Sequence, residues 1–326
     1  MRKGMWIYCL GMGVSLIFAC LLSGAHAADY PKKPVTLIVP YPAGGRTDLL
    51  GRIFVQVFSK HLTQPAVVTN KAGAGTVLGT TEVIKADPDG YTLGLLSNGL
   101  VASHYMLPDT IQLWKEVEPV AMINFDPTVL VASEKTGFKS LKELIAFAKK
   151  NPKKLNVGIN QGTATSLYTV AFMKTAGIEG VYVPFKGGGE GKAAIAGGHI
   201  DAHCDAAYIY KPIVDAQKAR FMGISSERRD PFFPDIPTFK EQGVDISWGT
   251  WHGIFTPKKT PPEIIETLEK AIEKTLADKE LIEMMNKNQL AIVYKDRQQY
   301  ARFLENEDRV YREEAIEMGL YNPKKK

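Results

Sequence analysis

Residues 35–52 combine the residue types and spacing that can bind an anion. The stretch begins with V-T-L-I-V, which predicts a buried strand because apolar and β-branched side chains dominate it. Gly44 and Gly45 then permit a sharp turn, and Thr47 or Asp48 is predicted to cap a helix. The N–H groups and dipole of a helix N-terminus attract negative charge, and Arg46 adds a cation beside them. An ordinary strand-to-helix connection has the same pattern, so both interpretations stay open at this point.

Three further glycine-containing turns follow predicted strands. They lie at residues 73–76, 161–166 and 186–189, and the first turn lies at 43–46. In open parallel sheets, ligands bind at the carboxyl ends of the strands. We therefore expect all four turns to face one binding cleft.

Signatures of catalysis and cofactor binding are weak in this chain. It has no G-x-S-x-G elbow and no H-E-x-x-H zinc motif, and its K-G-G-G-E-G-K run lacks the spacing of a phosphate loop. His199 and His203 would share one face of a strand but lie about 13 Å apart, and Cys204 would point the other way, which does not suit a metal. We expect no cofactor and no metal. Ser166 and Asp205 are the candidates if the chain is an enzyme.

The N-terminus is typical of a secretory signal. Two basic residues come first, an apolar stretch follows at residues 5–22, and the tripeptide A-H-A fits a cleavage site. We predict a signal peptide over residues 1–27, removed after Ala27, and an exported mature chain. An uncleaved membrane anchor and a lipid-modified Cys20 are the alternatives. If the signal peptide is cleaved, Cys204 is the only cysteine of the mature chain, which excludes an internal disulfide.

Size and charge limit the other possibilities. The chain has 326 residues, which is long for one domain and comfortable for two. The formal net charge is +5, and loss of the two basic residues of the signal leaves +3 (5 − 2). No basic stripe with interleaved aromatic residues occurs, so we expect no nucleic-acid partner.

The order of the predicted elements indicates two α/β lobes with a cleft between them. The predicted strands are 35–39, 66–70, 91–97, 120–123, 129–132, 155–159, 181–185, 199–204, 221–225, 248–255 and 292–294. A crossover at residues 124–127 separates the fourth strand from the fifth. T-P-P-E predicts a helix start with Thr260 as its cap, and further helices are predicted at 279–288 and 296–318. The lobes would comprise residues 28–125 with 249–326, and residues 126–248.

Six stretches in order along the mature chain carry a family likeness. They are P-K-K-P-V-T-L-I-V-P-Y-P-A-G-G-R-T-D from Pro31, V-V-T-N-K-A-G-A-G-T from Val67, A-D-P-D-G-Y-T-L from Ala86, V-P-F-K-G-G-G-E from Val183 with A-G-G-H-I-D from Ala196, P-D-I-P-T-F-K-E-Q-G-V from Pro234, and T-P-P-E-I-I from Thr260. With these stretches the chain resembles the periplasmic solute receptors of tripartite tricarboxylate transporters, the Bug or TctC-like proteins.

The resemblance implies a type II periplasmic-binding-protein fold, in which two α/β lobes close on a ligand. It also implies a monomeric receptor, located in the periplasm, that captures a small carboxylated solute and delivers it to a two-subunit membrane permease. The ligand-binding positions that match the family's loops, together with Ser97 at the end of the third strand, are Tyr41, Ala43, Gly44, Gly45, Arg46, Asp48, Ser97, Gln161, Gly162, Thr163, Ser166, Lys186, Gly187, Gly188 and Asp205.

Some positions depart from the family pattern. Arg46 stands where small residues are common, His199 where Gln is common, and Cys204 where an apolar residue is usual. Since Arg46 lies inside the expected binding loop, we expect it to affect the choice of ligand. The resemblance leaves open whether the ligand is a di- or tricarboxylate, an amino acid or an aromatic acid. Two other functions stay open, namely a receptor that presents its ligand to a membrane sensor, and a secreted enzyme acting on a carboxylate.

Overall fold

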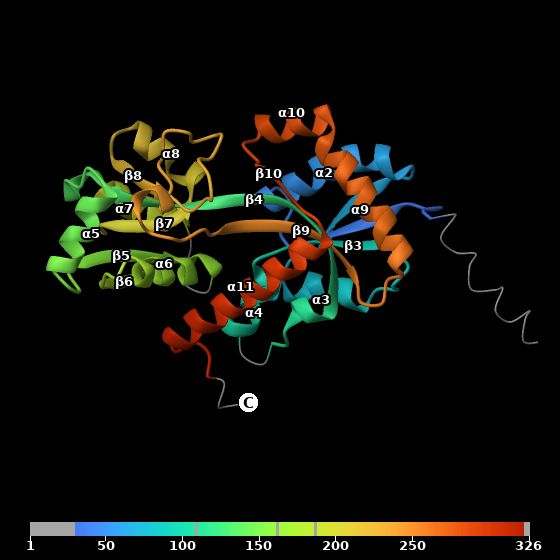
Figure 1. Ribbon diagram of the computed structural model, residues 1–326, viewed down its shortest axis with the longest axis horizontal. Coiled ribbons are helices and arrows are strands. Elements are labelled where there is room, and N and C mark those ends of the chain that lie inside the picture. The colour runs from blue at the N-terminus through green and yellow to red at the C-terminus, as the bar shows by residue number, and fades with distance from the viewer. Residues whose placement is uncertain (1–29, 108–109, 161–162, 186–187, 323–326) are drawn as a thin grey trace, which may run out of the picture.

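The computed structural model describes residues 30–107, 110–160, 163–185 and 188–322. It has two α/β lobes side by side, connected by long strands that run between them (Figure 1). The predicted signal peptide at 1–27 lies outside the described residues, as do the predicted site residues Gln161, Gly162, Lys186 and Gly187. None of the helices that the structure describes is both long enough and apolar enough to cross a membrane.

The first lobe is built on three strands that are parallel, as the sequence predicts, and that lie in the order β2-β1-β3. The strands are β1 (Val35–Val39), β2 (Ala66–Asn70) and β3 (Thr92–Ser97). The helices that follow them are α2 (Arg46–Leu62), α3 (Val77–Lys85) and α4 (Gly99–Met106), with short 3-10 turns at η1 (Ala74–Thr76) and η2 (Leu113–Glu116). The apolar residues of β1 and of the inner face of α2 are buried together, which is why this strand and helix pack closely.

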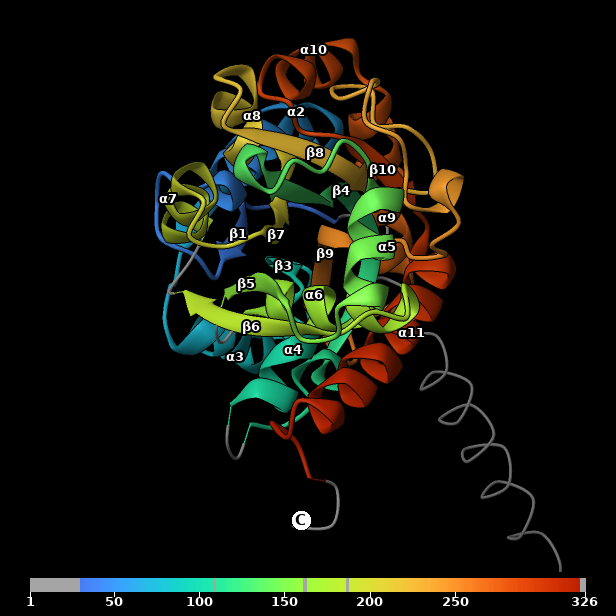
Figure 2. The same ribbon diagram turned by 90° about the vertical axis from the view of Figure 1, so that its left-hand side faces the viewer.

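The second lobe repeats the alternation of strand and helix. Its strands are β5 (Leu155–Asn160), β6 (Gly180–Phe185), β7 (Ala202–Ala206) and β8 (Ala219–Ile224). Its helices are α5 (Leu141–Lys150), α6 (Ala164–Thr175), α7 (Gly188–Gly197) and α8 (Ala207–Asp215), with 3-10 turns at η3 (Glu134–Thr136) and η4 (Lys240–Gln242). Figure 2, seen from the end of this lobe, shows α7 and α5 on opposite sides of its strands, with α8 above them.

Two long strands belong to both lobes. β4 (Val117–Ser133) and β9 (Gly249–Pro257) pair antiparallel, from Val117 opposite Pro257 to Pro127 opposite Gly249. The predicted break between two short strands is therefore wrong, because β4 continues through residues 124–127. The predicted crossover is present, since β4 pairs with β9 up to Pro127 and with β7 of the second lobe from Thr128. Polar residues can stay in this strand because their side chains have partners, such as Ala291 O for Asn124 Nδ2 at 2.8 Å. The lobe boundaries themselves stay a prediction.

The C-terminal segment packs largely against elements of the first lobe. It consists of α9 (Pro262–Ala277), α10 (Lys279–Lys287), β10 (Ile292–Lys295) and α11 (Arg297–Glu317). Helix α9 packs against α2, strand β10 pairs antiparallel with β4, and α11 lies along α4 and reaches α6 of the second lobe. The C-terminal helix therefore contacts both lobes.

Two predicted helix caps are wrong. Helix α2 begins at Arg46 with Gly45 as its N-cap, so Asp48 lies inside its first turn and accepts a hydrogen bond from Gly44 N at 2.8 Å. Helix α9 has Pro261 as its N-cap, and the hydroxyl of Thr260 donates to Pro257 O at 2.8 Å instead. The side chain of Asp48 still satisfies a backbone donor before α2, although it does so from within the helix.

Candidate functional site

A cavity of 330 Å³ lies between the lobes at the carboxyl end of β3. The described residues that line it come from both lobes and from the shared strand β9. They are Tyr41, Thr47, Gly75, Thr76, Ser97, Asn98, Gly99, Ala102, Ser103, Met106 and Leu107 of the first lobe, Thr163, Ala164 and Thr165 of the second, and Thr250 of β9. The cavity therefore lies where the sequence predicts the cleft.

Four helices begin at this cavity. The first residues of α2, α3, α4 and α6 or their N-caps are among its lining residues, and none of the four N-caps makes a side-chain capping hydrogen bond. The first turn of a helix has N–H groups without intrahelical partners, and its dipole favours negative charge. In α3 the first N–H groups are already used, since Val77 N donates to Ala74 O and Leu78 N to Gly73 O. The first turns of α2, α4 and α6 around one space make it suitable for an anion.

The lining is polar but uncharged. Among the described lining residues there is no Asp, Glu, Lys, Arg or His. The hydroxyls of Thr76 and Ser103 are buried and have no hydrogen-bond partner within the described part of the chain. Ala102, Met106 and Leu107 supply an apolar side. This combination suits a small anion with a short hydrocarbon body, held by hydroxyl and N–H groups.

Two side chains of the cavity are held in place by neighbours. The hydroxyls of Tyr41 and Ser97 lie 2.5 Å apart, and burial raises the pKa of Tyr41, so its hydroxyl stays protonated. Asn98 Nδ2 donates to Gly249 O of β9 at 2.9 Å, and Tyr168 of α6 donates to the same carbonyl at 2.9 Å. Asn98 thus connects the end of β3 to a shared strand and to the second lobe.

Thr47 is positioned by a chain of hydrogen bonds from β4 and β9. Since Asn124 uses its amide nitrogen as a donor, its Oδ1 accepts from His252 Nδ1 at 2.7 Å. His252 Nε2 is then an acceptor, and the hydroxyl of Thr47 donates to it at 3.0 Å. Burial lowers the pKa of His252 to about 4, which keeps the ring neutral near pH 7. The chain fixes the start of α2 against β9.

Comparison with known proteins identifies the family of this chain. The profile of the tripartite tricarboxylate transporter family receptor matches residues 50–319. The chain belongs to this receptor family. A Cupriavidus necator protein named "UPF0065 protein in gbd 5'region" is 33% identical over 317 residues, which are 94% of this chain and 94% of that protein.

Solved structures agree with this assignment. A TctC solute-binding protein from Polaromonas, without ligand, is 31% identical and superposes with a TM-score of 0.80 over 88% of this chain and 99% of that one. MatC from Rhodopseudomonas palustris with bound malate is 27% identical, with a TM-score of 0.66 over 88% and 100%. Another R. palustris protein, with adipate, is 26% identical, with a TM-score of 0.71 over 89% and 99%. The two-lobe solute-binding fold predicted from the sequence is confirmed.

Arg46 of this receptor lies beside the cavity rather than in its lining. Its guanidinium donates from Nε to Asp126 Oδ2 at 2.8 Å, from Nη2 to Asp126 Oδ1 at 3.0 Å, and from Nη2 to Gln289 O at 2.6 Å. It also lies 4.4 Å from the centre of the Tyr208 ring, which belongs to α8 of the second lobe. Arg46 therefore connects both lobes to β4, and its expected effect on ligand choice stays a prediction.

The other predicted residues of the first loop have different positions. Tyr41 lines the cavity, whereas Ala43, Gly44 and Gly45 form an exposed turn that is absent from its lining. Asp48 is buried, and although burial acts to raise its pKa, hydrogen bonds from Arg52, Gly44 and Asn70 lower it overall. Asp48 thus holds the turn in shape.

Of the predicted site residues of the second lobe, some line the cavity and others do not. Thr163 lines the cavity, while the buried Ser166 donates its hydroxyl to Thr163 O at 2.6 Å and supports the start of α6. Asp205 accepts from Asn160 Nδ2 at 2.7 Å, and burial raises the pKa of its carboxyl. Gly188 is next to it, since a Cβ there would lie 2.4 Å from Asp205 Oδ2. Neither Asp205 nor Gly188 lines the cavity, and no metal-binding cluster occurs among the described residues.

Several lining residues are missing from the sequence-based prediction. Thr76, Asn98, Ser103, Met106 and Leu107 all lie on or beside α3 and α4. Helix α4 was not predicted, since nearly all its residues are buried and it has no polar face to create a helical period. The S-N-G run after β3 was the available signal, because it repeats the strand-turn-helix order of the first loop.

Replacing Arg46 by Ala should destabilise the receptor, because Asp126 would lose its cation while its side chain is only 9% exposed. We expect the free energy of unfolding, measured by urea titration, to fall by roughly 1–3 kcal/mol. This is less than the roughly 3–5 kcal/mol that breaking a fully buried ion pair costs. Asp126→Asn in the Arg46→Ala background should recover part of it. Arg309→Ala, which removes an exposed pair with Glu313, is the control and should cost under about 1 kcal/mol. Equal effects of the two alanine variants would contradict this role of Arg46.

His252 should make the receptor less stable in mild acid. Its pKa is about 4 when folded and about 6.5 when unfolded, so between these values only the unfolded chain binds the proton, and stability falls as the pH falls. Between pH 6.5 and pH 5 this amounts to roughly 2 kcal/mol. We expect the unfolding free energy of wild type to fall by about that much more than that of His252→Gln. Glu307, whose pKa burial raises to about 7, changes stability in the opposite sense but is common to both proteins. Parallel pH profiles would contradict the assignment.

Proposed function

We propose that this receptor binds one small carboxylate in the 330 Å³ cavity, closes its lobes on it, and delivers it to a two-subunit membrane permease. The observation that carries the proposal is the convergence of three helix N-termini without side-chain caps, those of α2, α4 and α6, on an uncharged cavity. The malate and adipate bound by two structural relatives support the carboxylate class. Within that class, di- and tricarboxylates, acidic amino acids and aromatic acids are the candidates.

The energy of such a site is sufficient for capture. A carboxylate at a helix N-terminus gains roughly 0.3–2 kcal/mol from the dipole. Each charge-assisted hydrogen bond contributes roughly 1.5–3 kcal/mol. A few of these bonds together approach the roughly 8 kcal/mol that micromolar affinity requires, without a cation in the lining. Binding of this kind needs no chemical step, so we propose that the receptor is not an enzyme.

The proposal includes the cellular context. We propose that residues 1–27 are a signal peptide, that cleavage follows Ala27, and that the mature receptor acts in the periplasm as a monomer. The two lobes that close would be residues 28–125 with 249–326, and residues 126–248. The receptor character of the family supports this context, as does the periplasmic binding protein BugD among the structural relatives, which is 27% identical with a TM-score of 0.68.

A ligand screen tests the proposed function. The purified mature receptor is examined by native mass spectrometry for retained solute and then by thermal shift with a panel of carboxylates and their neutral amides. A carboxylate at 100 times its Kd should add roughly 2.7 kcal/mol to stability, and the matching amide should add far less. The ligand should be recovered unchanged after incubation. A panel in which no carboxylate stabilises the protein, or recovery of an altered ligand, would contradict the proposal.

Thr165→Asp should block ligand binding without unfolding the receptor. Thr165 is in the first turn of α6 and lines the cavity, and a carboxylate in that turn is favourable for the helix itself. At about 5 Å and an effective dielectric of about 20, its repulsion of a bound carboxylate is about 3 kcal/mol, so affinity should fall roughly 100-fold. Thr165→Asn has nearly the same size without the charge and should change affinity only a few-fold. Calorimetry on both variants decides, and similar affinities would show that the ligand binds elsewhere.

A further inference from the structure

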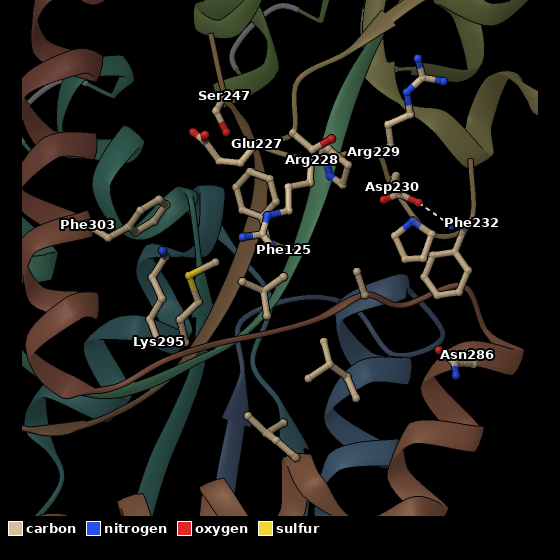
Figure 3. A pocket seen from close by; sticks show the side chains of 18 of the residues that line it. Phe125, Glu227, Arg228, Arg229, Asp230, Phe232, Ser247, Asn286, Lys295 and Phe303 are labelled. Atoms are coloured by element: carbon tan, nitrogen blue, oxygen red, sulfur yellow. Dashed lines mark hydrogen bonds between the residues drawn. The ribbon is translucent and has the colours of Figure 1, made fainter. Parts of the chain in front are cut away.

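A second and larger cavity, of 880 Å³, lies between the lobes and shares no lining residue with the first. One wall is the loop at residues 226–232 of the second lobe, and the other is formed by α10, β10 and α11 of the first. Met122 and Phe125 of β4 also line it. We call this cavity the β10 groove, and Figure 3 shows its side chains from close by. Its volume is in the range of pockets for small organic ligands.

Most of the charged side chains in the β10 groove already have partners. Arg229 pairs with Glu241 at 3.0 Å, and Glu227 accepts from Lys240 at 3.3 Å. Asp230 is buried and accepts from Phe232 N at 2.8 Å. Asp230 is thus held by a backbone donor rather than by a cation, and the cations of the lining without an ion pair among the described residues are Arg228 and Lys295.

Arg228 and Lys295 make no ion pair with any residue in the part of the chain that the structure describes. Figure 3 shows both side chains directed into the groove, one from each wall. The ammonium of Lys295 lies 5.7 Å from the centre of the Phe303 ring. Ser226, which also lines the groove, has a buried hydroxyl without a hydrogen-bond partner among the described residues. Two cations from opposite walls thus face one space.

The rest of the lining is largely apolar. Phe125 and Phe303 supply aromatic rings, and Leu276, Ile282 and Val293 supply aliphatic side chains. Apolar surface and aromatic rings favour a hydrocarbon or aromatic body, while two cations from opposite walls favour an acidic group on it. We propose that the β10 groove binds an amphipathic organic anion, with Arg228 and Lys295 as the partners of its acidic group.

The groove couples such a ligand to the movement of the lobes, a step that rests on the proposed function. Its two walls belong to different lobes and β4 passes between them, so rotation of the lobes changes the width of the groove. A ligand that fits one width better stabilises that arrangement. Binding of the groove ligand then changes the affinity of the first cavity for the carboxylate. The carboxylate in turn changes the affinity of the groove for its ligand by the same factor.

The test uses 8-anilinonaphthalene-1-sulfonate as the probe, with the purified mature receptor and calorimetry. We expect saturable binding of one molecule per chain, weakened at least tenfold in Arg228→Glu/Lys295→Glu. The matched control, Lys218→Glu/Arg312→Glu, changes the net charge equally at two exposed positions outside the groove and should bind as wild type does. If the glutamate pair fails to fold, Arg228→Ala/Lys295→Ala should still weaken binding several-fold.

Three results would overturn the proposal. The first is that the probe does not bind saturably, and the second is that the groove and control variants bind it with equal affinity. The third is that Thr165→Asp loses probe binding, which would place the probe in the first cavity. Failure of the proposed function gives a different result, since probe binding would persist in the groove while no carboxylate stabilises the receptor. A final titration with the probe in the presence of a saturating carboxylate measures the coupling between the two cavities. An unchanged affinity for the probe would contradict that coupling.

Discussion

The antiparallel pairing of β4 with β9 is the interaction on which the rest of the structure depends. Backbone hydrogen bonds join the two strands along nearly the whole of β9, and both strands pass from one lobe into the other. The pair connects the two lobes. Each functional feature is tied to this pair, since Thr250 of β9 lines the first cavity and Phe125 of β4 lines the β10 groove.

Side chains near these strands decide how the lobes meet. Asp126 of β4 receives the guanidinium of Arg46, and that guanidinium also contacts Tyr208 of the second lobe. On β9, His252 holds Thr47 and Gly249 O accepts from Asn98. Two polar side chains of the first cavity, Thr47 and Asn98, are thus fixed by partners on β9. A fixed and uncharged lining with helix N-termini can select an anion by direction and distance rather than by a mobile cation.

Local patterns in the sequence predict much of the fold. Alternation of apolar strands with glycine turns and amphipathic helices places β1, β2, β3 and the C-terminal helices nearly where the structure has them. Features that depend on distant partners were not predictable from such patterns. The polar run at residues 124–127 resembles a loop, yet it stays in β4 because Asn124 and Asp126 bond to residues far away in the chain. Helix α4 has no polar face, so periodicity gives no signal for it.

In the candidate site, too, some features follow from the local sequence and others depend on distant partners. Tyr41, Ser97 and Thr163 line the cavity and were predicted, since Ser97 ends a strand and the other two lie between a strand and a helix. The direction of Arg46 was not predictable, because its partner Asp126 is 80 positions away in the sequence. A loop can be recognised from its own residues, whereas the direction of each side chain in it depends on the tertiary contacts that surround it.

In the proposed function, helix N-termini and not a cation hold a carboxylate between the lobes. The most direct test is calorimetric titration of the mature receptor with its best carboxylate and with the neutral amide of the same compound, at low and at high salt. We predict an affinity for the carboxylate at least about 100-fold higher than for the amide, because several charge-assisted bonds are lost with the charge. An amide that binds as tightly as the carboxylate would contradict it.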